Sequence, residues 1–455
     1  MSILYFKKKD ERADDKAVDF DSVMEEKRIQ GLLRVLLIGS GGREAAMAWK
    51  IVASEIVDKL YIAPGNGGTE TFGINLPLVD GSVFEAVADA VKRHGINLLV
   101  VGPEAPLTAG IADWFEERKA DFPDLMIVGP NASGARLEGS KAFSKAFMKQ
   151  YGIPTARYRA FKPEEAELAE KFLDTLRPPY VLKADALAAG KGVIIAETRE
   201  QATEALNELF AGVWGEKGQQ VVIEEFLSGK ECSMFVALDG THYALLPEAM
   251  DYKRIGDGNT GPNTGGMGAI SPVPFADDAF KEKVKTRIIE PTLAGLAAEG
   301  IRYKGFLFLG LMNVEGDPYV IEYNCRLGDP ETQAVMLRLK SDFGRLLKAI
   351  ATESLDQYKV ETDERAAVCL VLASKGYPGS YVKGYEILLP DATEETVLFH
   401  AGTRRADGKL TTSGGRVLSV VSYGSTVAAA AARCYTIARQ VVFEGKNYRH
   451  DIGKV

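Results

Sequence analysis

The chain has 455 residues, 46% hydrophobic and 26% charged, with a formal net charge of −8. This composition is ordinary for a globular protein, and at roughly 100–200 residues per domain the length suggests two to four domains. Because nucleic-acid binders need a basic surface to neutralise phosphates, the acidic balance argues against a nucleic-acid partner.

Membrane spans, disulfides and metal-binding cysteine or histidine motifs are not expected either. No apolar stretch approaches the ~20 residues of a membrane helix, and residues 1–30 lack the apolar centre of a signal peptide. The four cysteines and four histidines are scattered, without CxxC or HExxH spacing. We therefore expect a cytoplasmic protein with reduced thiols, whose residues 1–33 form a loosely packed helical extension.

Short apolar runs alternate with helical patterns in the first part of the chain. These runs end at or beside Gly or Pro: RVLLIG (34–39), KLYIA (59–63), LLVVG (98–102) and LMIVG (125–129). Such alternation predicts a doubly wound parallel sheet, which binds ligands beyond the carboxyl ends of its strands. Three loops follow strands at that edge: GSGGRE (39–44), APGNGG (63–68) and GPEAPL (102–107).

The first of these loops raises a dinucleotide-binding alternative. Its fingerprint, G-x-G-x-x-G, fails here because Glu44 occupies the third glycine position and the second strand does not end at an acid. Two interpretations of this loop stay open. The glycine amides, helped by Arg43, bind an anion at the helix start, or the loop is a tight turn without a ligand.

The middle and end of the chain predict further helices and strands. We expect helices at 140–150 and 277–299, an Ala-rich helix at 426–442, and an irregular Gly-rich stretch at 253–268. The predicted strands are YVLKAD (180–185), VVIEEFL (221–227), CSMFVALDG (232–240), HYALLPEAMDY (242–252), FLFLGLMNV (306–314), PYVIEYN (318–324), AAVCLVLAS (366–374), YEILLP (385–390) and RVLSVVSYG (416–424).

Four segments carry residues suited to nucleotide chemistry. In LKADALAAGKGV (182–193), small residues would let a loop lie over phosphates while Lys183 and Lys191 supply charge. The segment lacks the G-x-x-x-x-G-K-[ST] pattern, so a P-loop is excluded, and an ordinary hairpin remains an equal alternative. In VVIEEFLSGKECS (221–233), the strand could present its backbone to adenine and a carboxylate to ribose, or simply have a solvated acidic side.

The other two segments are PYVIEYNCRLGDPETQ (318–333) and the stretch 247–275. Glu322 and Asn324 lie two residues apart on a strand, so they share a face and offer the oxygens that Mg²⁺ prefers. Arg326 continues that spacing and could stabilise a transferred phosphoryl group, although an exposed polar face would look the same. The long charged, glycine-rich stretch is more typical of a binding loop than of a connector.

Taken together, these segments resemble the phosphoribosylamine–glycine ligase family of the ATP-grasp superfamily. The resemblance covers about residues 34–453 and rests on long motifs: GSGGREAAMAWK, APGNGG, VGPEAPL, LEGSKAFSKAFM, KADALAAGKGV, EEFLSGKECS, DYKRIGDGNTGPNTGGMGAISP and IEYNCRLGDPETQ. It implies an α/β and α+β multidomain fold. The implied parts are the extension (1–33), a doubly wound substrate domain (34–135), two ATP-grasp subdomains (136–225 and 226–360) and a small β-rich C-terminal domain (361–455).

The resemblance also implies a role for each matching residue. ATP would contact Lys141, Lys183, Ala188, Gly190, Lys191, Gly192, Glu224, Glu225, Leu227 and Glu231. Mg²⁺ or Mn²⁺ would bind Glu322 and Asn324, and the catalytic residues would be Arg326, Lys253, Arg254 and Asp251. The organic substrates would contact Gly41, Gly42, Arg43, Glu44, Asn66, Gly67, Glu104, Asn263 and Thr264.

The implied activity joins glycine to 5-phosphoribosylamine in de novo purine synthesis through glycyl phosphate, splitting ATP to ADP and phosphate. The implied partners are small molecules, with neither nucleic acid nor membrane. A monomer in transient contact with the preceding pathway enzyme is expected.

The sequence departs from the family pattern at four positions. Ala45 and Tyr252 stand where many members have His, Ala186 where Gly is usual, and Gly310 where other ATP-grasp enzymes have an acid. Three alternatives remain: a related ATP-grasp ligase or carboxylase acting on another acid, an NAD(P)-dependent dehydrogenase, and a catalytically silent nucleotide-binding protein.

Overall fold

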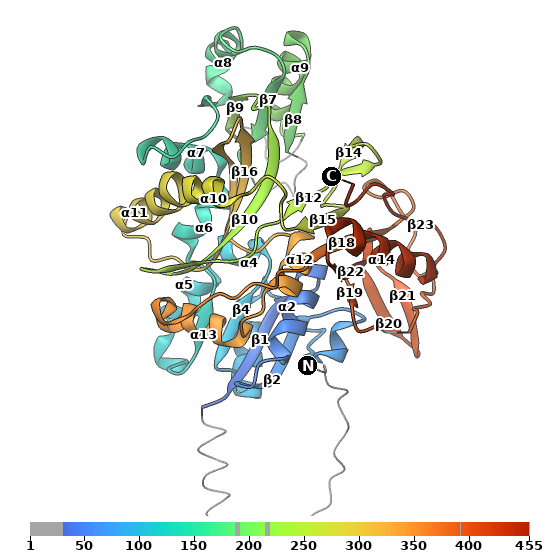
Figure 1. Cartoon of the computed structure of the whole chain (residues 1–455). Helices are drawn as coiled ribbons and strands as arrows, with labels where there is room; N and C mark the ends of the chain where they lie inside the picture. Colours follow the sequence, from blue (N-terminus) through green and yellow to red (C-terminus); the bar gives the residue numbers. More distant parts are fainter. Residues whose placement is uncertain (1–30, 187–191, 214–218, 392, 455) are drawn as a thin grey trace, which may run out of the picture.

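The computed structural model describes residues 31–186, 192–213, 219–391 and 393–454. The predicted leader at 1–30 lies outside these residues. Within them lie four sheets and two small hairpins (Figure 1). Among the helices of these residues, none is long and apolar enough to cross a membrane.

The first sheet is parallel and has the strand order β3-β2-β1-β4-β5. Its strands are β1 (Leu33–Gly39), β2 (Val57–Pro64), β3 (Ile74–Asn75), β4 (Leu98–Val101) and β5 (Met126–Val128). Helices α2 (Gly42–Val52), α3 (Phe84–His94), α4 (Glu104–Thr108) and α5 (Ile111–Glu116) lie in the connections between its strands. Helices α6 (Ala132–Gly139) and α7 (Lys141–Gln150) follow β5 and pack against each other.

Both faces of this sheet are buried, as its continuous apolar strands predict. Alternate residues of β1 point to opposite faces, so Leu36 and Ile38 join one hydrophobic core while Val35 and Leu37 join another. The doubly wound architecture predicted for this region is confirmed.

The second and third sheets are antiparallel. The second, β6-β9-β7-β8, forms the lobe that extends from the top of the molecule in Figure 1. It comprises β6 (Tyr158–Phe161), β7 (Tyr180–Ala184), β8 (Val193–Ala196) and β9 (Val221–Glu225), with helices α8 (Ala166–Leu173) and α9 (Arg199–Phe210). The third, β11-β10-β16-β17, comprises β10 (Lys230–Asp239), β11 (Tyr243–Leu245), β16 (Lys304–Val314) and β17 (Asp317–Asn324).

The predicted helix at 277–299 is present but interrupted. It consists of α10 (Asp278–Val284), a π-helical stretch (Lys285–Ile289) and α11 (Glu290–Ala298). Two further helices follow the third sheet, α12 (Glu331–Arg338) and α13 (Phe343–Thr352). Helix α12 packs against both α2 and β18, so it joins the first sheet to the last.

The fourth sheet is antiparallel and has the order β12-β15-β18-β22-β19, with β23 beside β18. Its strands are β12 (Met250–Asp251), β15 (Gly268–Ser271), β18 (Ala366–Ser374), β19 (Thr396–His400), β22 (Arg416–Gly424) and β23 (Lys446–Asn447). The predicted Ala-rich helix is present as α14 (Val427–Gln440), which packs against β18 and β22. Strand β20 (Thr403–Ala406) pairs with β21 (Lys409–Thr412) as a separate hairpin.

Three sequence predictions in this half are wrong. Segment 242–252 is not one strand, because β11 joins the third sheet and β12 the fourth. Segment 253–268 is not wholly irregular, because β13 (Arg254–Gly256) and β14 (Thr260–Asn263) pair as a hairpin. Segment 385–390 makes only isolated bridges rather than a strand.

The predicted domain boundaries near residues 135, 225 and 360 stay a prediction. Strand β15 precedes residue 360 but pairs with β18, which follows it, and β12 pairs with β15 on the other side. The hydrophobic cores also cross these boundaries. The second core contains Val35 from the first sheet, Phe235 from the third and Val421 from the fourth. The first, third and fourth sheets therefore share a core, whereas the second sheet has a core of its own.

The fourth sheet is joined to the first by a contact at His400, the last residue of β19. The backbone oxygen of His400 accepts a hydrogen bond from Asn66 Nδ2 at 2.8 Å, and the Gly67 N–H donates to Thr403 O at 3.0 Å. A Cβ on Gly68 would lie 2.2 Å from the imidazole ring, so only glycine fits there. The ring is buried, and its burial, with Arg405 nearby, lowers the pKa of His400 to about 4.

This joint predicts a specific acid sensitivity. Below the ordinary pKa of 6.5 the unfolded chain protonates this imidazole while the folded protein keeps it neutral, so stability falls as pH drops towards 4. Between pH 7 and 4.5, the free energy of unfolding of the wild type should fall by about 2 to 3 kcal/mol more than that of His400→Gln. Urea titrations at several pH values test this. An equal fall in the free energy of unfolding of the wild type and of His400→Gln would contradict it.

Candidate functional site

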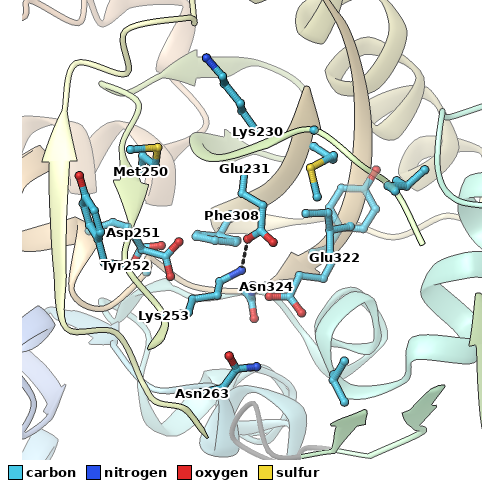
Figure 2. Close-up of a pocket in the computed structure, with 18 of the residues that line it drawn as sticks. Lys230, Glu231, Met250, Asp251, Tyr252, Lys253, Asn263, Phe308, Glu322 and Asn324 are labelled. Atoms are coloured by element: carbon cyan, nitrogen blue, oxygen red, sulfur yellow. Dashed lines mark hydrogen bonds and ion pairs between the residues drawn. The ribbon is translucent and has the colours of Figure 1, made fainter. Parts of the chain in front are cut away.

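A cavity of about 1490 Å³ collects residues from the second and third sheets, helix α7 and the segments around the β13–β14 hairpin. Figure 2 shows part of it, with Lys253 directed towards Glu231 and the side chains of Glu322 and Asn324 close by. Most residues predicted to bind nucleotide, metal or substrate line this cavity, although they are far apart in sequence. The cavity is therefore the candidate functional site.

One end of the cavity is built around the buried carboxylate of Glu224 on β9. Lys183 of β7 and Lys145 of α7 each place a side-chain nitrogen 2.8 Å from it. Burial opposes ionisation, yet Lys183 and Lys145 hold the pKa of Glu224 below its usual value. Burial lowers the pKa of Lys145 to about 8, so this lysine is mostly charged at neutral pH. The carboxylate thus fixes two ammonium groups.

Lys145 was not predicted from the sequence. Its signal was the KAFSK spacing (141–145), which puts Lys141 and Lys145 on the same face of a helix, one turn apart. Lys145 is 2% exposed and also donates a 2.6 Å hydrogen bond to Thr155 Oγ1. It is therefore a buried structural partner of the predicted lysines.

Lys141, the first residue of α7, contacts the start of the predicted phosphate loop. Its Nζ donates to the backbone oxygen of Ala186 at 2.8 Å, and Asp185 accepts from the Ala142 N–H at 3.1 Å. Gly192 at the other end of the loop lines the cavity. The remaining predicted loop residues, Ala188, Gly190 and Lys191, lie outside the described residues.

Strand β17 supplies an oxygen-rich surface through Glu322 and Asn324, which both line the cavity as their spacing predicted. Burial opposes ionisation of Glu322, but Lys253, Lys183, Lys141 and Arg326 keep its pKa below the usual value. Gly310 lies opposite Glu322 on β16, and a Cβ there would be 3.1 Å from Glu322 Cγ. An ionised carboxylate beside an amide oxygen is a donor set that fits Mg²⁺ or Mn²⁺.

Arg326 follows this strand and is held between two carboxylates. Its guanidinium lies 3.2 Å from Glu104 Oε2 and 2.8 Å from Glu138 Oε1, so it bridges α4 and α6. Burial opposes the charge, whereas Glu138 and Glu104 raise the pKa of Arg326. Glu138 was missed by the sequence analysis. It also accepts a 2.8 Å hydrogen bond from the Cys325 N–H and thereby fixes the end of β17.

The end of the cavity beside Glu231 carries Asp251, Lys253, Arg254 and the pair Asn263–Thr264. Lys253 Nζ lies 2.5 Å from Glu231 Oε2, an ion pair drawn in Figure 2. Burial raises the pKa of Asp251 to about 7, with Lys253 opposing the shift.

A further acid at this end, Glu331 on α12, was not predicted. It lines the cavity and accepts a 3.0 Å hydrogen bond from Ser233 Oγ, and burial raises its pKa. The only sequence feature that could have indicated Glu331 is that it closely follows the predicted metal ligands, in GDPETQ (328–333). It adds a second carboxyl group beside Asp251.

The predicted residues of the first two loops do not line this cavity. Arg43 is buried, lies 2.5 Å from Glu44 and donates to the backbone oxygen of Leu327 at 3.2 Å. The Gly41 amide donates to the Glu44 carboxylate at 2.8 Å. Substrate contact by Gly41–Glu44, Asn66 and Gly67 stays a prediction, whereas Glu104 does line the cavity.

Three of the departures from the family pattern have clear surroundings. Ala45 is fully buried in the hydrophobic core. The Tyr252 hydroxyl accepts a 3.2 Å hydrogen bond from the Gly453 N–H, so it packs against the C-terminal segment. Ala186 contributes its backbone oxygen to Lys141.

Comparison with known proteins supports a common origin for all three parts of the chain. Models of the phosphoribosylglycinamide synthetase N domain, ATP-grasp (A) domain and C domain match residues 33–138, 139–332 and 367–455 respectively. The phosphoribosylamine–glycine ligase of Agrobacterium fabrum is 47% identical over 422 residues, covering 92% of this chain and 98% of the relative. That of Rhizobium meliloti is 48% identical with the same coverage.

Solved structures agree with this assignment. The phosphoribosylamine–glycine ligase of Thermotoga maritima matches with a TM-score of 0.80 and 40% identity, covering 92% of this chain and all of that one. A biotin carboxylase domain of a Hydrogenobacter thermophilus 2-oxoglutarate carboxylase, solved with MgADP, matches with a TM-score of 0.68 over 91% of this chain and 92% of that one. At 16% identity the latter shows a common fold alone.

The Lys145–Glu224–Lys183 cluster predicts a stability effect. Lys145→Met should lower the free energy of unfolding by about 3 kcal/mol, because the ionised Glu224 stays buried with one partner fewer. The matched surface variant Lys409→Met, which breaks a 3.4 Å pair with Glu386, should cost less than about 1 kcal/mol. Urea unfolding at pH 7 gives both values, and a loss at Lys145 as small as that at Lys409 would contradict the cluster's role.

Proposed function

The chain belongs to the phosphoribosylglycinamide synthetase family, and on that premise we propose how its cavity works. The protein is an ATP-dependent carbon–nitrogen ligase that joins glycine to 5-phosphoribosylamine in purine biosynthesis, giving glycinamide ribonucleotide. The observation that best supports the site is the convergence of Lys183, Glu322, Asn324 and Arg326 on one cavity.

ATP would occupy the end of the cavity formed by the second and third sheets. Lys141 and Lys183 would contact its phosphates, together with Gly192 and the preceding loop. The backbone of residues 224–227 would face adenine, because the Glu224 side chain is already paired with two lysines. Glu231, half-exposed at the rim, would accept hydrogen bonds from ribose. The paired lysines support this placement, because fixed cations bind phosphates without reorganising.

Glu322 and Asn324 would hold Mg²⁺ or Mn²⁺ between the protein and the phosphates. A bound divalent ion neutralises the phosphate charge and acts as a Lewis acid. The low pKa of Glu322 supports this role, because the carboxylate is ionised and ready to bind a cation at neutral pH. Arg326 would stabilise the charge of the transferred phosphoryl group. Its ion pairs with Glu104 and Glu138 fix the orientation of the guanidinium.

The reaction would run in two steps. A carboxylate oxygen of glycine attacks the γ-phosphorus of ATP, releasing ADP and forming glycyl phosphate. The neutral amine of phosphoribosylamine then attacks the carbonyl carbon, phosphate leaves and the nitrogen loses a proton. The protein provides no nucleophile in this scheme. It positions the reactants, neutralises charge and excludes the water that would hydrolyse the anhydride.

The end with Asp251, Lys253 and Arg254 would bind glycine. Lys253 and Arg254 would attract its carboxylate, and Asp251 and Glu331 its ammonium group, with Asn263 and Thr264 closing the site. Two carboxyl groups and two cationic side chains line this part of the cavity, which supports the assignment. Glycine is a zwitterion, so its site needs positive charge for the carboxylate and negative charge for the ammonium group. Loops 39–44 and 63–68 would reach phosphoribosylamine at the edge of the first sheet.

We also propose that the enzyme works in the cytoplasm as a monomer and receives phosphoribosylamine by transient contact with the preceding enzyme. The instability of phosphoribosylamine supports a direct transfer. The dehydrogenase alternative has no support. It rested on the glycine loop 39–44, where the Gly41 N–H already donates to the Glu44 carboxylate instead of facing a ligand phosphate.

The ligase assignment predicts strict dependence on all substrates. ADP release with Mg-ATP should require both glycine and freshly generated phosphoribosylamine. Glu322→Ala should lower kcat at least about a hundredfold, because it removes a group that holds the metal at the phosphates. Glu282→Ala, at an exposed position on α10, is the matched control and should retain wild-type activity. ADP release without glycine, or an active Glu322→Ala, would refute the assignment.

The glycine site predicts a pH dependence. Asp251 must be ionised to hold the glycine ammonium group, and burial places its pKa at about 7. The KM for glycine should therefore fall as pH rises from 5.5 to 7 and level off above, by up to about tenfold per unit. Asp251→Asn should have a high KM without this step. A wild-type KM that is constant over this range would contradict the proposed contact.

A further inference from the structure

The last described residues of the chain return to the cavity. After β23 the segment 448–454 runs along the β13–β14 hairpin, and Figure 1 shows the C-terminus beside β14. Gly453 and Lys454 line the cavity, together with Arg254, Asn259 and Asn263 of the hairpin. The C-terminal segment and the hairpin thus form one wall.

The main link between them is Arg449, whose side chain is only 1% exposed. Its guanidinium donates to the backbone oxygen of Arg254 at 3.1 Å and to Asn259 Oδ1 at 2.9 Å, so it holds both the first strand and the turn of the hairpin. Asp451 accepts two hydrogen bonds from Arg449, at 2.8 and 2.7 Å, and this fixes the direction of the guanidinium. The same group lies 5.1 Å from the ring centre of Tyr252.

Further contacts hold the tip of the hairpin. The Gly258 N–H donates to Asp451 at 2.8 Å, and Asp257 accepts from the His450 N–H at 2.7 Å. Hydrogen bonds from Arg449 and, to a lesser extent, from the Gly258 amide lower the pKa of Asp451 to about 2. The contacts of Asp451 therefore persist over the pH range in which an enzyme of this kind works.

The hairpin needs such support. It is only two strands, paired at Arg254↔Asn263 and Gly256↔Thr260 with an irregularity between them, and joins no larger sheet. An isolated two-stranded hairpin is at best marginally stable in water. Its position over the cavity is therefore decided by what holds it, and among the described residues the C-terminal segment makes the contacts to its turn.

We propose that residues 449–454 are a strap that fixes the β13–β14 hairpin over the organic-substrate end of the cavity. Arg449, Asp451 and the strap's partner Asp257 are then positioning residues for substrate binding, although they do not touch substrate themselves. The identity of the substrates and the position of ATP rest on the proposed function. Since ATP would lie against the second sheet, loosening the strap should weaken binding of the organic substrates and leave ATP binding unchanged.

Asp257→Ala in the full chain is the first test, because this half-exposed side chain contacts the strap without entering the core. The KM for glycine or phosphoribosylamine should rise at least about fivefold, with the KM for ATP within about twofold of wild type. Trypsin should cut faster after Lys253 or Arg254, because the released hairpin opens more often. Glu386→Ala, an exposed acid elsewhere in the C-terminal part, is the matched control and should match wild type in all three values.

Asp451→Asn is a second variant that keeps the size of the side chain and weakens its contacts with Arg449 and Gly258. It should reproduce both the substrate-selective KM increase and the faster cleavage. The strap is refuted if both variants match Glu386→Ala, or if the KM for ATP rises as much as those of the organic substrates. A wild-type protein without glycine-dependent ADP release would instead refute the proposed function, and the cleavage rates would still decide whether the strap holds the hairpin.

Discussion

Concentrating many charges in one cavity is the constraint on which the rest of this structure depends. A charge taken out of water is tolerated only when a partner neutralises it and hydrogen bonds satisfy it. Lys145 and Lys183 share Glu224, and Arg326 lies between Glu104 and Glu138. Because these partners belong to different sheets and helices, pairing the charges also fixes how the parts of the chain are arranged.

The loop 327–330 shows how the outer parts of the protein act on the centre. Arg43, from the first sheet's glycine loop, donates to the backbone oxygen of Leu327, and Arg416 of the fourth sheet lies 3.0 Å from the Asp329 carboxylate. This loop directly follows Arg326. The first and last parts of the chain therefore brace the residue proposed to steady the phosphoryl group. Together with the proposed strap, they give the terminal parts a role in shaping the cavity.

Much of the fold could be predicted because local pattern and tertiary environment agree. The apolar runs of the first sheet are continuous because both faces are covered, and the Ala-rich helix matches α14. Prediction failed where tertiary pairing overrode local pattern. The run 242–252 looks like one strand, but its two ends pair with different sheets. The run 385–390 has strand-like composition, yet only single residues meet a partner.

By itself the sequence determined which chemical groups are available and most of the segments that carry them. The spacing of Glu322 and Asn324 on a strand, and the lysines near a glycine loop, follow from local geometry that a motif records. Only the tertiary structure decided that Lys145 pairs with Glu224, that Glu138 pairs with Arg326, and that the C-terminal segment contacts the hairpin. These relations join residues far apart in the chain, and no local spacing encodes such contacts because they arise when separate elements pack together.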